Sequence, residues 1–571
     1  MTHIERKIDY DRRLLCFVIL LIAAALTLPF IGMGHFYTRG EPREALVALA
    51  MIEQGNFVLP VFQGEFAFKP PMLHWLVSLF SLPQGYVSEY TARMPSALAF
   101  IAMSVGFFSF YARRYDVRKV FVATLIMMTT FEVHRAAMTC RVDMVLTAFM
   151  VGGFLALYCW YERGFKGVPV VAALLISGAI LTKGPIGAIL PCFALTVFLL
   201  IHRIKWTTIL RALLIISVMS SILPLCWYVA AYNVGGDRFL QLVLEENFGR
   251  FMGKMTYESH ENGIFYYFPI LAAGLVPWSV LLLLGLFTIK KKSLTKEALV
   301  GAWKKFRTMP AARQWAVVVT VCVFVFYCIP KSKRSVYLLP LYPFISLLIA
   351  DFLVYMVREH RKLFKGYAVF VVSVGFLFSI LLLLVPALDL NFLGDSRSSR
   401  RLIMQLGELQ HMAYGPYYIV MALLPALVGV AAVVMRKKEG VMVTLAFTVW
   451  IAALLSLDGL LNPAIKNSVP DFQFAKSALV YQPDGAAYFY RPASEKEETL
   501  YTVVFYMDDK LLSYTEGDVL PEHGYIILRE ANKGRFEAHM ADKFNIAQLL
   551  TTETEFTSFR GNLLLYEFSA K

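Results

Sequence analysis

Two acidic residues stand where polar and apolar sequence meet, and either could deprotonate or orient a substrate hydroxyl. Glu41 lies in the run GEPRE that begins at Gly40, where the flanking Gly and Pro place its carboxylate at a helix start. Helix capping alone also explains an acid there. Asp143 leads directly into an apolar run, where a charge is costly and indicates function, although a headgroup location would also explain it. We predict Glu41 and Asp143 as the catalytic residues.

Several basic residues, in segments that the charge distribution described below places on the outer side of the membrane, could hold a phosphate. Lys69 lies among aromatic residues and prolines, Arg250 follows an acidic pair, and Lys331 and Lys333 share a very short loop. Each of them could instead anchor its helix at the lipid headgroups by snorkelling. His260 is a further candidate for substrate or metal binding, although a single loop histidine is more often only solvated.

The elements that must position these residues are membrane-spanning helices. Of the 571 residues, 58% are hydrophobic and 17% are charged, and the mean hydropathy is +0.58. This composition excludes a disordered or an ordinary soluble protein. A helix needs about 20 mostly apolar residues to cross a bilayer, and about thirteen segments meet this need. They start near Leu14, Arg93, Val120, Asp143, Val168, Ile186, Ala212, Ile264, Trp315, Val336, Tyr367, Tyr417 and Val441.

The charge distribution predicts the orientation of these spans. The formal net charge is +14. If the N-terminus lies in the cytoplasm, the cytoplasmic segments carry 28 Lys and Arg against 8 Asp and Glu, a net charge of +20, and all other residues carry −6. Lys and Arg are retained in cytoplasmic loops, so the positive charge indicates orientation, and we expect no nucleic-acid partner. The first segment lacks a signal-peptide cleavage site, and we expect it to remain as a span.

We predict two domains. Residues 1–461 form the transmembrane domain, whose outer loops 34–92 and 233–263 are long enough to build a site. Residues 462–571 form a small soluble α/β domain on the outer side. The seven cysteines lie in or beside hydrophobic segments, and their spacing shows neither a disulfide framework nor a zinc motif.

Local patterns predict elements within the outer regions. In the C-terminal region, runs at Leu500 to Tyr506, Tyr525 to Leu528 and Leu563 to Tyr566 are typical of strands. In the first outer loop, Ala45 to Gln54 is predicted to be a helix that lies on the membrane surface.

Several short motifs, taken in order, resemble those of membrane glycosyltransferases that use polyprenyl-phosphate sugars. This group includes the protein O-mannosyltransferases and the 4-amino-4-deoxy-L-arabinose lipid A transferase. The resemblance covers nearly the whole chain, and the small outer C-terminal domain fits the arabinose transferase better. It is carried by Glu41-Pro42-Arg43-Glu44-Ala45, Gln54 to Pro60, Phe68 to Trp75, Arg93 to Ala97, Asp143, Leu181 to Pro185, Glu246 with Arg250-Phe251, His260, Pro277-Trp278, Lys331 to Lys333 and Tyr337 to Pro340.

The resemblance implies an α-helical polytopic GT-C fold in the bacterial inner membrane, with the site on the periplasmic face. The implied donor is a sugar linked to undecaprenyl phosphate, and the acceptor is lipid A or another envelope glycolipid. The reaction would be direct displacement at the anomeric carbon with inversion. The implied donor-phosphate and substrate-binding residues are Arg43, Lys69, Glu246, Arg250, His260, Lys331, Lys333 and Tyr337.

The chain departs from the family pattern in ways that affect the expected site. The family commonly has Asp before the loop Glu and Tyr after the Arg, where this chain has Gly40 and Glu44. In the arabinose transferase an acid before the Lys and a His after the second loop Glu bear on metal binding, and here these are Phe68 and Asn247. No cofactor is therefore assigned, a divalent metal stays an open alternative, and so does the sugar.

Other functions remain open from the sequence. A protein O-glycosyltransferase would share the same fold. A lipid or solute transporter or flippase would also need a polar outer cavity, but such proteins often show paired halves with broken helices, and this sequence has no internal repeat. A membrane anchor for a C-terminal binding module would not need thirteen spans.

Overall fold

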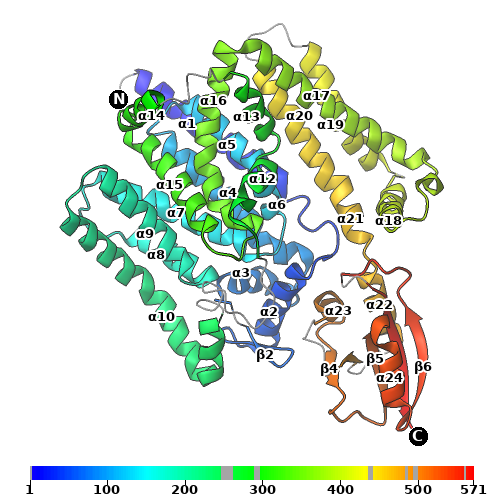
Figure 1. Ribbon diagram of the computed structural model, residues 1–571. Coiled ribbons are helices and arrows are strands. Elements are labelled where there is room, and N and C mark those ends of the chain that lie inside the picture. The colour runs from blue at the N-terminus through cyan, green and yellow to red at the C-terminus, as the bar shows by residue number, and fades with distance from the viewer. Residues whose placement is uncertain are drawn as a thin grey trace.

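The chain folds into a large helical bundle that carries a small mixed sheet near its C-terminus (Figure 1). This confirms the predicted polytopic α-helical fold with a C-terminal α/β region. The computed structural model describes residues 3–67, 69–245, 261–288, 296–413, 415–434, 441–481, 487–492, 499–558 and 561–571.

Within these residues, seven helices are long and apolar enough to cross a membrane, and up to ten spans result if each bent helix pair counts as one. The predicted number of thirteen is not confirmed. Two of the predicted spans are shorter than a bilayer requires, namely α8 (Val170–Lys183) and α9 (Ile186–Ile201). The seven are Glu89–Tyr111 (α4), Val142–Glu162 (α7), Trp206–Leu244 (α10), Ala311–Cys328 (α15), Ser335–Glu359 (η4 and α16), Arg361–Ala387 (α17 and η5) and Val441–Asn467 (α20, η7 and α21).

Three further predicted spans are broken by bends that hydrophobicity alone does not reveal. Helices α5 (Val117–Thr129) and α6 (Phe131–Ala137) meet at 66°. At this break the Thr130 hydroxyl donates to the carbonyl of Ile126 at 2.7 Å, a side-chain bond that competes with the helix ladder. The other bent pairs are η2 and α12 (Ile264–Gly274) with α13 (Trp278–Leu286) at 112°, and α18 (Arg397–His411) with α19 (Pro416–Val434) at 111°.

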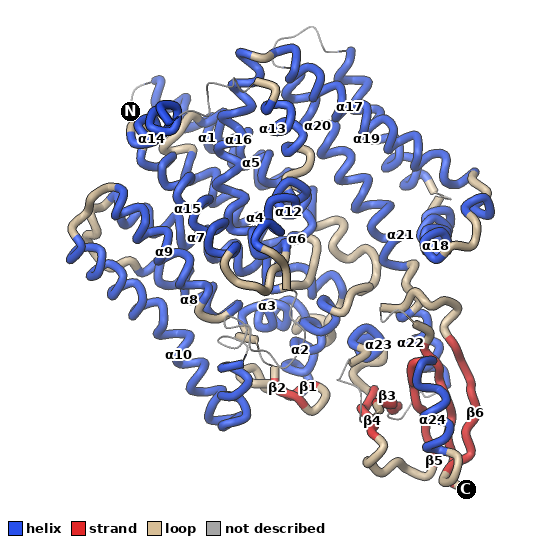
Figure 2. The backbone as a smooth tube through the Cα atoms, in the orientation of Figure 1, coloured by secondary structure: helices blue, strands red, loops and turns tan. Residues whose placement is uncertain are grey.

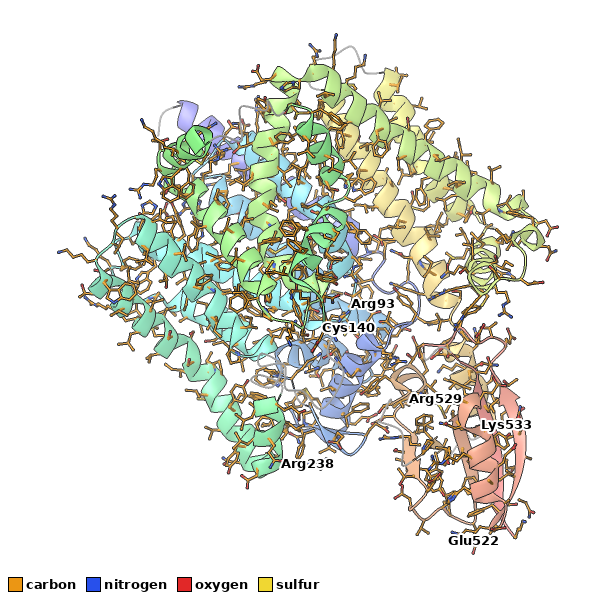
Figure 3. All side chains as sticks on the ribbon, in the orientation of Figure 1. Arg93, Cys140, Arg238, Glu522, Arg529 and Lys533 are labelled. Carbon is orange, nitrogen blue, oxygen red and sulfur yellow. The ribbon has the colours of Figure 1, made fainter. Side chains whose placement is uncertain are left out.

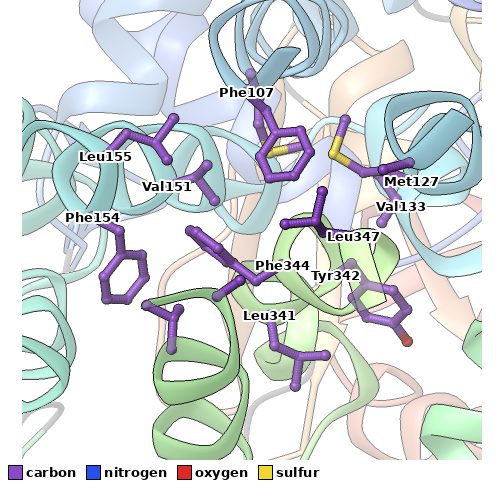
Figure 4. Packing of buried hydrophobic residues seen from close by; sticks show 14 of the residues in the cluster. Phe107, Met127, Val133, Val151, Phe154, Leu155, Leu341, Tyr342, Phe344 and Leu347 are labelled. Carbon is purple, nitrogen blue, oxygen red and sulfur yellow. The ribbon is translucent and has the colours of Figure 1, made fainter. Parts of the chain in front are cut away.

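The largest hydrophobic core lies where α4, α5, α7 and α16 (Tyr342–Glu359) pack against one another. Figure 4 shows Phe107, Val151, Phe344 and Leu347 converging from three of these helices. Phe107 and Phe344 pack edge to face, with ring centroids 6.1 Å apart. Because these side chains are fully buried, they hold α4, α7 and α16 packed against one another.

The C-terminal region contains a five-stranded sheet in the order β4-β3-β5-β7-β6 (Figure 2). Strands β3, β4 and β5 run parallel, and β7 pairs antiparallel with β5 and β6. Helix α24 covers one face, and α22 and α23 cover the other. The bounds are β3 Ala487–Arg491, β4 Leu511–Thr515, β5 His523–Arg529, β6 Phe544–Thr551, β7 Leu563–Ala570, α22 Asp471–Tyr481, α23 Tyr501–Tyr506 and α24 Lys533–Met540.

One predicted strand in this region is wrong. The runs at Tyr525 to Leu528 and Leu563 to Tyr566 lie in strands β5 and β7, but Leu500 to Tyr506 leads into helix α23. Its residues are apolar nearly throughout, so alternation is weak and both faces can be buried. Val503 and Val504 are both buried, between the sheet and the first outer segment.

The first outer segment contains α2 (Gly40–Gln54), a hairpin of β1 (Val61–Phe62) and β2 (Glu65–Phe66), and α3 (Met72–Ser81). Helix α2 ends at Gly55, whose φ of 61° provides the left-handed cap that closes many helices. The helix itself is as predicted, and its placement on the membrane surface stays a prediction. Residues Ala45 to Met51 are buried, because α2 packs against α3 and α23. One hydrophobic core therefore joins this segment to the C-terminal sheet.

Four further helices are α1 (His3–Thr27), α14 (Lys296–Arg307) and the short η6 (Leu390–Leu393) and η8 (Glu530–Asn532).

Candidate active site

Helix α2 places two carboxylates one after the other in its first turns. Glu41 and Glu44 are 1% and 3% exposed, so neither can keep its charge without partners. The partners of each come from different parts of the fold.

The carboxylate of Glu41 forms a buried ion pair with Arg93 of α4. The Arg93 Nε donates to Glu41 Oε1 at 2.8 Å, and the Cys140 backbone N–H donates to the same oxygen at 3.0 Å. Arg93 is fully buried and also donates to the carbonyls of Ile31 and Gly34, both at 2.9 Å. Figure 3 shows Arg93 and Cys140 close together, toward the end of the bundle that carries the C-terminal sheet. Burial disfavours the charge on Glu41, yet Arg93 holds its pKa below the usual value. This arrangement favours a role in fixing the loop.

Glu44 is the centre of a second cluster. Its Oε1 accepts from Arg43 Nη2 at 2.9 Å and from Lys69 Nζ, and its Oε2 accepts from His74 Nε2 at 3.0 Å. Burial opposes ionisation of Glu44, but the charges of Lys69 and Arg43 outweigh it and hold the pKa well below its usual range. The predicted residues Arg43 and Lys69 are thus brought together, by an acid that the sequence showed only as a departure from the family pattern.

Asp143 organises a third cluster at the start of α7. It lies 2.6 Å from Lys183 Nζ and 3.6 Å from Arg141 Nε. Lys183 is the last residue of α8, and its Nζ lies 4.4 Å from the ring centroid of Tyr337. The structure therefore brings the predicted Asp143 and Tyr337 together through Lys183, which lies in the family-like motif Leu181 to Pro185.

Lys69 belongs to the second cluster and is close enough to the third for the charge of Asp143 to act on its pKa. Burial and the neighbouring Arg43 lower the pKa of Lys69 to about 8, although Glu44 and Asp143 both act in the opposite direction. The guanidinium of Arg141 lies near the start of α2, because a Cβ added to Gly40 would be 3.8 Å from Arg141 Cζ. The result is a set of fixed cations between two carboxylates at the outer end of the bundle, an arrangement that suits a phosphate leaving group.

The other predicted residues differ in their surroundings. Lys333 is buried, and its Nζ donates to the carbonyls of Asn262 and Pro330. Lys331 is exposed in the same loop. Glu246, Arg250 and His260 lie outside the described residues.

A cavity of 140 Å³ borders the Glu44 cluster on its outer side. Arg43, Glu44, Lys69 and His74 line it from the first outer segment. His74 Nδ1 is buried and makes no hydrogen bond within the described residues. Among those residues, no group of three His, Cys, Asp or Glu side chains is placed to hold a metal ion.

Sequence reasoning missed Glu44, His74, Lys183 and the structural importance of Arg93. Some of these residues had a signal in the sequence. Glu44 lies three residues after the predicted Glu41 and thus on the same face of a helix, and Lys183 precedes Gly-Pro in one of the family-like motifs. His74 had only its place in the motif after Lys69 as a signal.

Comparisons with known proteins agree with this architecture. The family described as dolichyl-phosphate-mannose-protein mannosyltransferase matches residues 68–228. An uncharacterized protein of Aquifex aeolicus (strain VF5) is 28% identical over 390 residues, which are 66% of this chain and 70% of that protein. The undecaprenyl phosphate-alpha-4-amino-4-deoxy-L-arabinose arabinosyl transferase of Shewanella sediminis (strain HAW-EB3) is 24% identical over 362 residues, 62% of each protein. The match thus spans less than two thirds of that transferase.

The fold is also found in a solved structure. The crystal structure of ArnT from Cupriavidus metallidurans bound to undecaprenyl phosphate superimposes with a TM-score of 0.68 and 17% sequence identity, and the match covers 96% of this chain and 97% of that one. The likeness therefore extends through the spans and the C-terminal sheet.

Proposed function

We propose that this chain is a glycosyltransferase of the GT-C family and moves a sugar from an undecaprenyl-phosphate-linked donor to lipid A or another envelope glycolipid, a proposal that the family match, the relatives and the shared fold support. It is a multi-pass membrane protein. The observation that carries the proposal is the meeting of the Glu44 and Asp143 clusters around Lys69. The names of the arabinosyl transferases support the donor class, and the transferred sugar is left unassigned.

We place the N-terminus in the cytoplasm and the site on the periplasmic side. The charge difference between the two sets of loops supports this orientation. The lipid of the donor then lies in the bilayer, and its phosphate meets the site at the outer ends of α7 and α8. In this orientation residues 1–461 form the transmembrane domain, with its outer loops on the periplasmic side, and residues 462–571 form a periplasmic domain.

The donor phosphate is bound by Lys69, Lys183 and Tyr337 in this proposal, with Arg43 close by. When the bond between the anomeric carbon and the phosphate oxygen breaks, negative charge grows on the phosphate. Cations already fixed by Glu44 and Asp143 stabilise that charge without reorganising. Lys331 and Lys333, with the undescribed Glu246, Arg250 and His260, stay candidates for further contacts to the donor.

The acceptor attacks the anomeric carbon from the face opposite the phosphate, so the configuration inverts. Asp143 orients the acceptor, or takes the proton from a hydroxyl acceptor. A phosphate acceptor needs no base, because it is already anionic. Glu41 contributes by holding the loop through Arg93.

The experiment is transfer from undecaprenyl-phosphate-linked sugar to lipid A by the purified chain. Asp143→Asn is expected to abolish transfer while undecaprenyl phosphate binding survives, and Lys69→Ala is expected to weaken that binding. Lys533→Gln on α24 is the control, because its side chain is exposed and lies in the C-terminal sheet region. Full transfer by Asp143→Asn would remove the proposed acidic residue. Solute transport by proteoliposomes without any lipid-linked sugar would favour a transporter.

A protein acceptor is the second candidate, because the matched family is named for protein mannosylation. Mass spectrometry of lipid A and of glycoproteins from a deletion strain separates the two. A mass lost from lipid A supports the first candidate, and a mass lost only from proteins supports the second.

A further inference from the structure

A second cavity, which shares no residue with the candidate active site, lies between α1, α5 and α20 (Val441–Ser456). Its volume is about 1100 Å³, above the range of about 300–1,000 Å³ that is usual for small-molecule pockets. Asp11 and Arg12 of α1 line one end of it, and Figure 1 shows the N-terminus at the end of the bundle away from the C-terminal sheet. In the orientation that we propose, this end faces the cytoplasm, and we call the cavity the cytoplasmic groove.

The groove exists because α1 packs mainly against α4 and touches α20 only slightly. Apart from its charged end, it is lined mainly by apolar side chains of three helices, among them Leu15, Ile22, Phe121, Leu125, Phe447 and Ile451. Helices α5 and α20 belong to membrane-spanning segments or to a bent pair of helices that can form one. Apolar walls within a bilayer are covered by hydrocarbon and not by water, so a lipid chain suits this gap.

The charged end of the groove carries two arginines that the protein leaves available. Arg113 and Arg118 both line the groove and are exposed, and neither forms an ion pair within the described part of the chain. The neighbouring Arg114 differs, because it is paired with Glu162. Guanidinium groups bind phosphate oxygens through two parallel hydrogen bonds, so the pair can hold a phosphate at this end.

The acids at the same end do not cancel these two arginines. Asp116 caps α5, and its Oδ1 accepts from the Lys119 backbone N–H at 2.9 Å. Asp11 is next to Arg12 in α1, so these two charges offset each other locally. The three arginines and two aspartates that line the groove therefore leave a net positive charge, which comes from Arg113 and Arg118.

Basic loop residues on the cytoplasmic side are common in membrane proteins, and by themselves they indicate only orientation. Here the same arginines stand at the end of an apolar groove between helices. Basic pockets between spans on the cytoplasmic side bind the headgroups of anionic lipids. The groove thus combines a place for a phosphate with a place for an acyl chain.

We propose that the cytoplasmic groove binds one anionic phospholipid of the cytoplasmic leaflet, with the chemistry of phosphatidylglycerol. Its phosphate lies at Arg113 and Arg118, and an acyl chain lies between α1 and α20. The bound lipid fills the gap that the packing of α1 leaves, and it stabilises the folded chain because it binds that state alone. This inference goes beyond the proposed reaction and needs none of the active-site residues.

The test is a lipid titration of the purified, delipidated full-length chain in detergent, followed by native mass spectrometry. The probes are phosphatidylglycerol and phosphatidylcholine with identical acyl chains. We expect one phosphatidylglycerol to bind about tenfold or more tightly than phosphatidylcholine, and the double variant Arg113→Gln/Arg118→Gln to lose that preference.

Two further variants separate the groove from the general attraction of a basic surface. Lys166→Gln/Lys205→Gln is the matched control, because it removes two exposed bases from loops that our orientation places on the same side, outside the groove. It should leave both affinities within about twofold. Thr444→Trp places a large side chain at an exposed position of the groove wall and keeps every charge. It should weaken the binding of phosphatidylglycerol by excluding the acyl chain.

Several outcomes overturn the inference. Equal binding of the two phospholipids by the wild type would remove the anionic headgroup, and an equal loss in the Lys166→Gln/Lys205→Gln control would reduce the effect to surface charge. If Arg113→Gln/Arg118→Gln unfolds at a lower temperature than the wild type without lipid, Thr444→Trp decides. Unchanged affinity for phosphatidylglycerol in Thr444→Trp contradicts the groove as the site. A small protein bound in equal amount to the purified chain would assign the groove to a partner helix.

Discussion

Glu41 and Glu44 lie three residues apart on one helix and are almost equally buried, yet their surroundings differ. Glu41 meets a fully buried arginine and a backbone N–H. Glu44 meets one arginine, one lysine and one histidine, and these border a cavity. The difference separates a carboxylate that holds the fold from one that holds cations ready for a substrate.

The chemistry of the partners explains this division. The guanidinium of Arg93 is planar, always charged and bonded through both its fork and its Nε, so it leaves Glu41 little freedom. Lys69 is a flexible ammonium group, and burial together with the nearby Arg43 lowers its pKa to about 8. In our proposal, Glu41 therefore serves the stability of the fold and Glu44 serves substrate binding.

The largest expected effect comes from breaking the ion pair between Glu41 and Arg93. Arg93→Ala leaves Glu41 buried without its partner, and we expect a loss of about 3–5 kcal/mol in the free energy of unfolding. Unfolding of the purified protein in detergent measures it. The control is Arg238→Ala, whose pair with Glu65 is more than half exposed, and its effect should stay below about 1 kcal/mol. A stable Arg93→Ala variant would mean that Glu41 is not held by this pair.

The second effect should appear in activity and not in folding. Glu44→Gln keeps the shape of the side chain but removes the charge that holds Arg43 and Lys69. We expect sugar transfer to fall on the order of 10-fold to 100-fold, as for groups that orient a charged ligand-binding residue. A transfer assay on protein with a wild-type unfolding temperature measures it. Normal transfer by such a variant would mean that Glu44, like Glu41, acts only in folding and does not hold cations for the substrate.

The third effect is a pH dependence at Lys69. Protonated Lys69 is the form that attracts a phosphate, and its pKa of about 8 means that this form declines as pH rises through 8. Affinity for undecaprenyl phosphate should thus fall about tenfold between roughly pH 7 and pH 9.5. Titration of binding over this range measures it. Lys69→Arg stays charged throughout and should flatten the curve, whereas a flat wild-type curve would exclude Lys69 as a phosphate ligand.

The smallest effect is expected at His74. His74→Gln retains a side-chain N–H that can donate to Glu44 Oε2, so we expect transfer to fall only about threefold to tenfold. The same transfer assay measures it, with Lys533→Gln as the control. A loss as large as that of Glu44→Gln would show that the imidazole contacts the substrate itself.

Much of the fold followed from the sequence because burial in a bilayer demands long apolar segments. The number of spans did not, since bends such as the one at Thr130 depend on local hydrogen bonds. The sequence also did not distinguish helix from strand in short buried elements. The helix at Tyr501 to Tyr506 is buried on all sides, which removes the alternation that distinguishes a strand from a helix.

The sequence by itself determined a multi-span membrane protein, because long apolar segments carry that information, and it offered Asp143 and Lys69 as candidate site residues from their types and positions. Only the tertiary structure decided which acid meets which cation. Arg93 reaches Glu41 from 52 positions away, and Lys69 and His74 reach Glu44 from 25 and 30 positions away. Such pairings depend on how α2, α3 and α4 pack, and local sequence does not encode that packing.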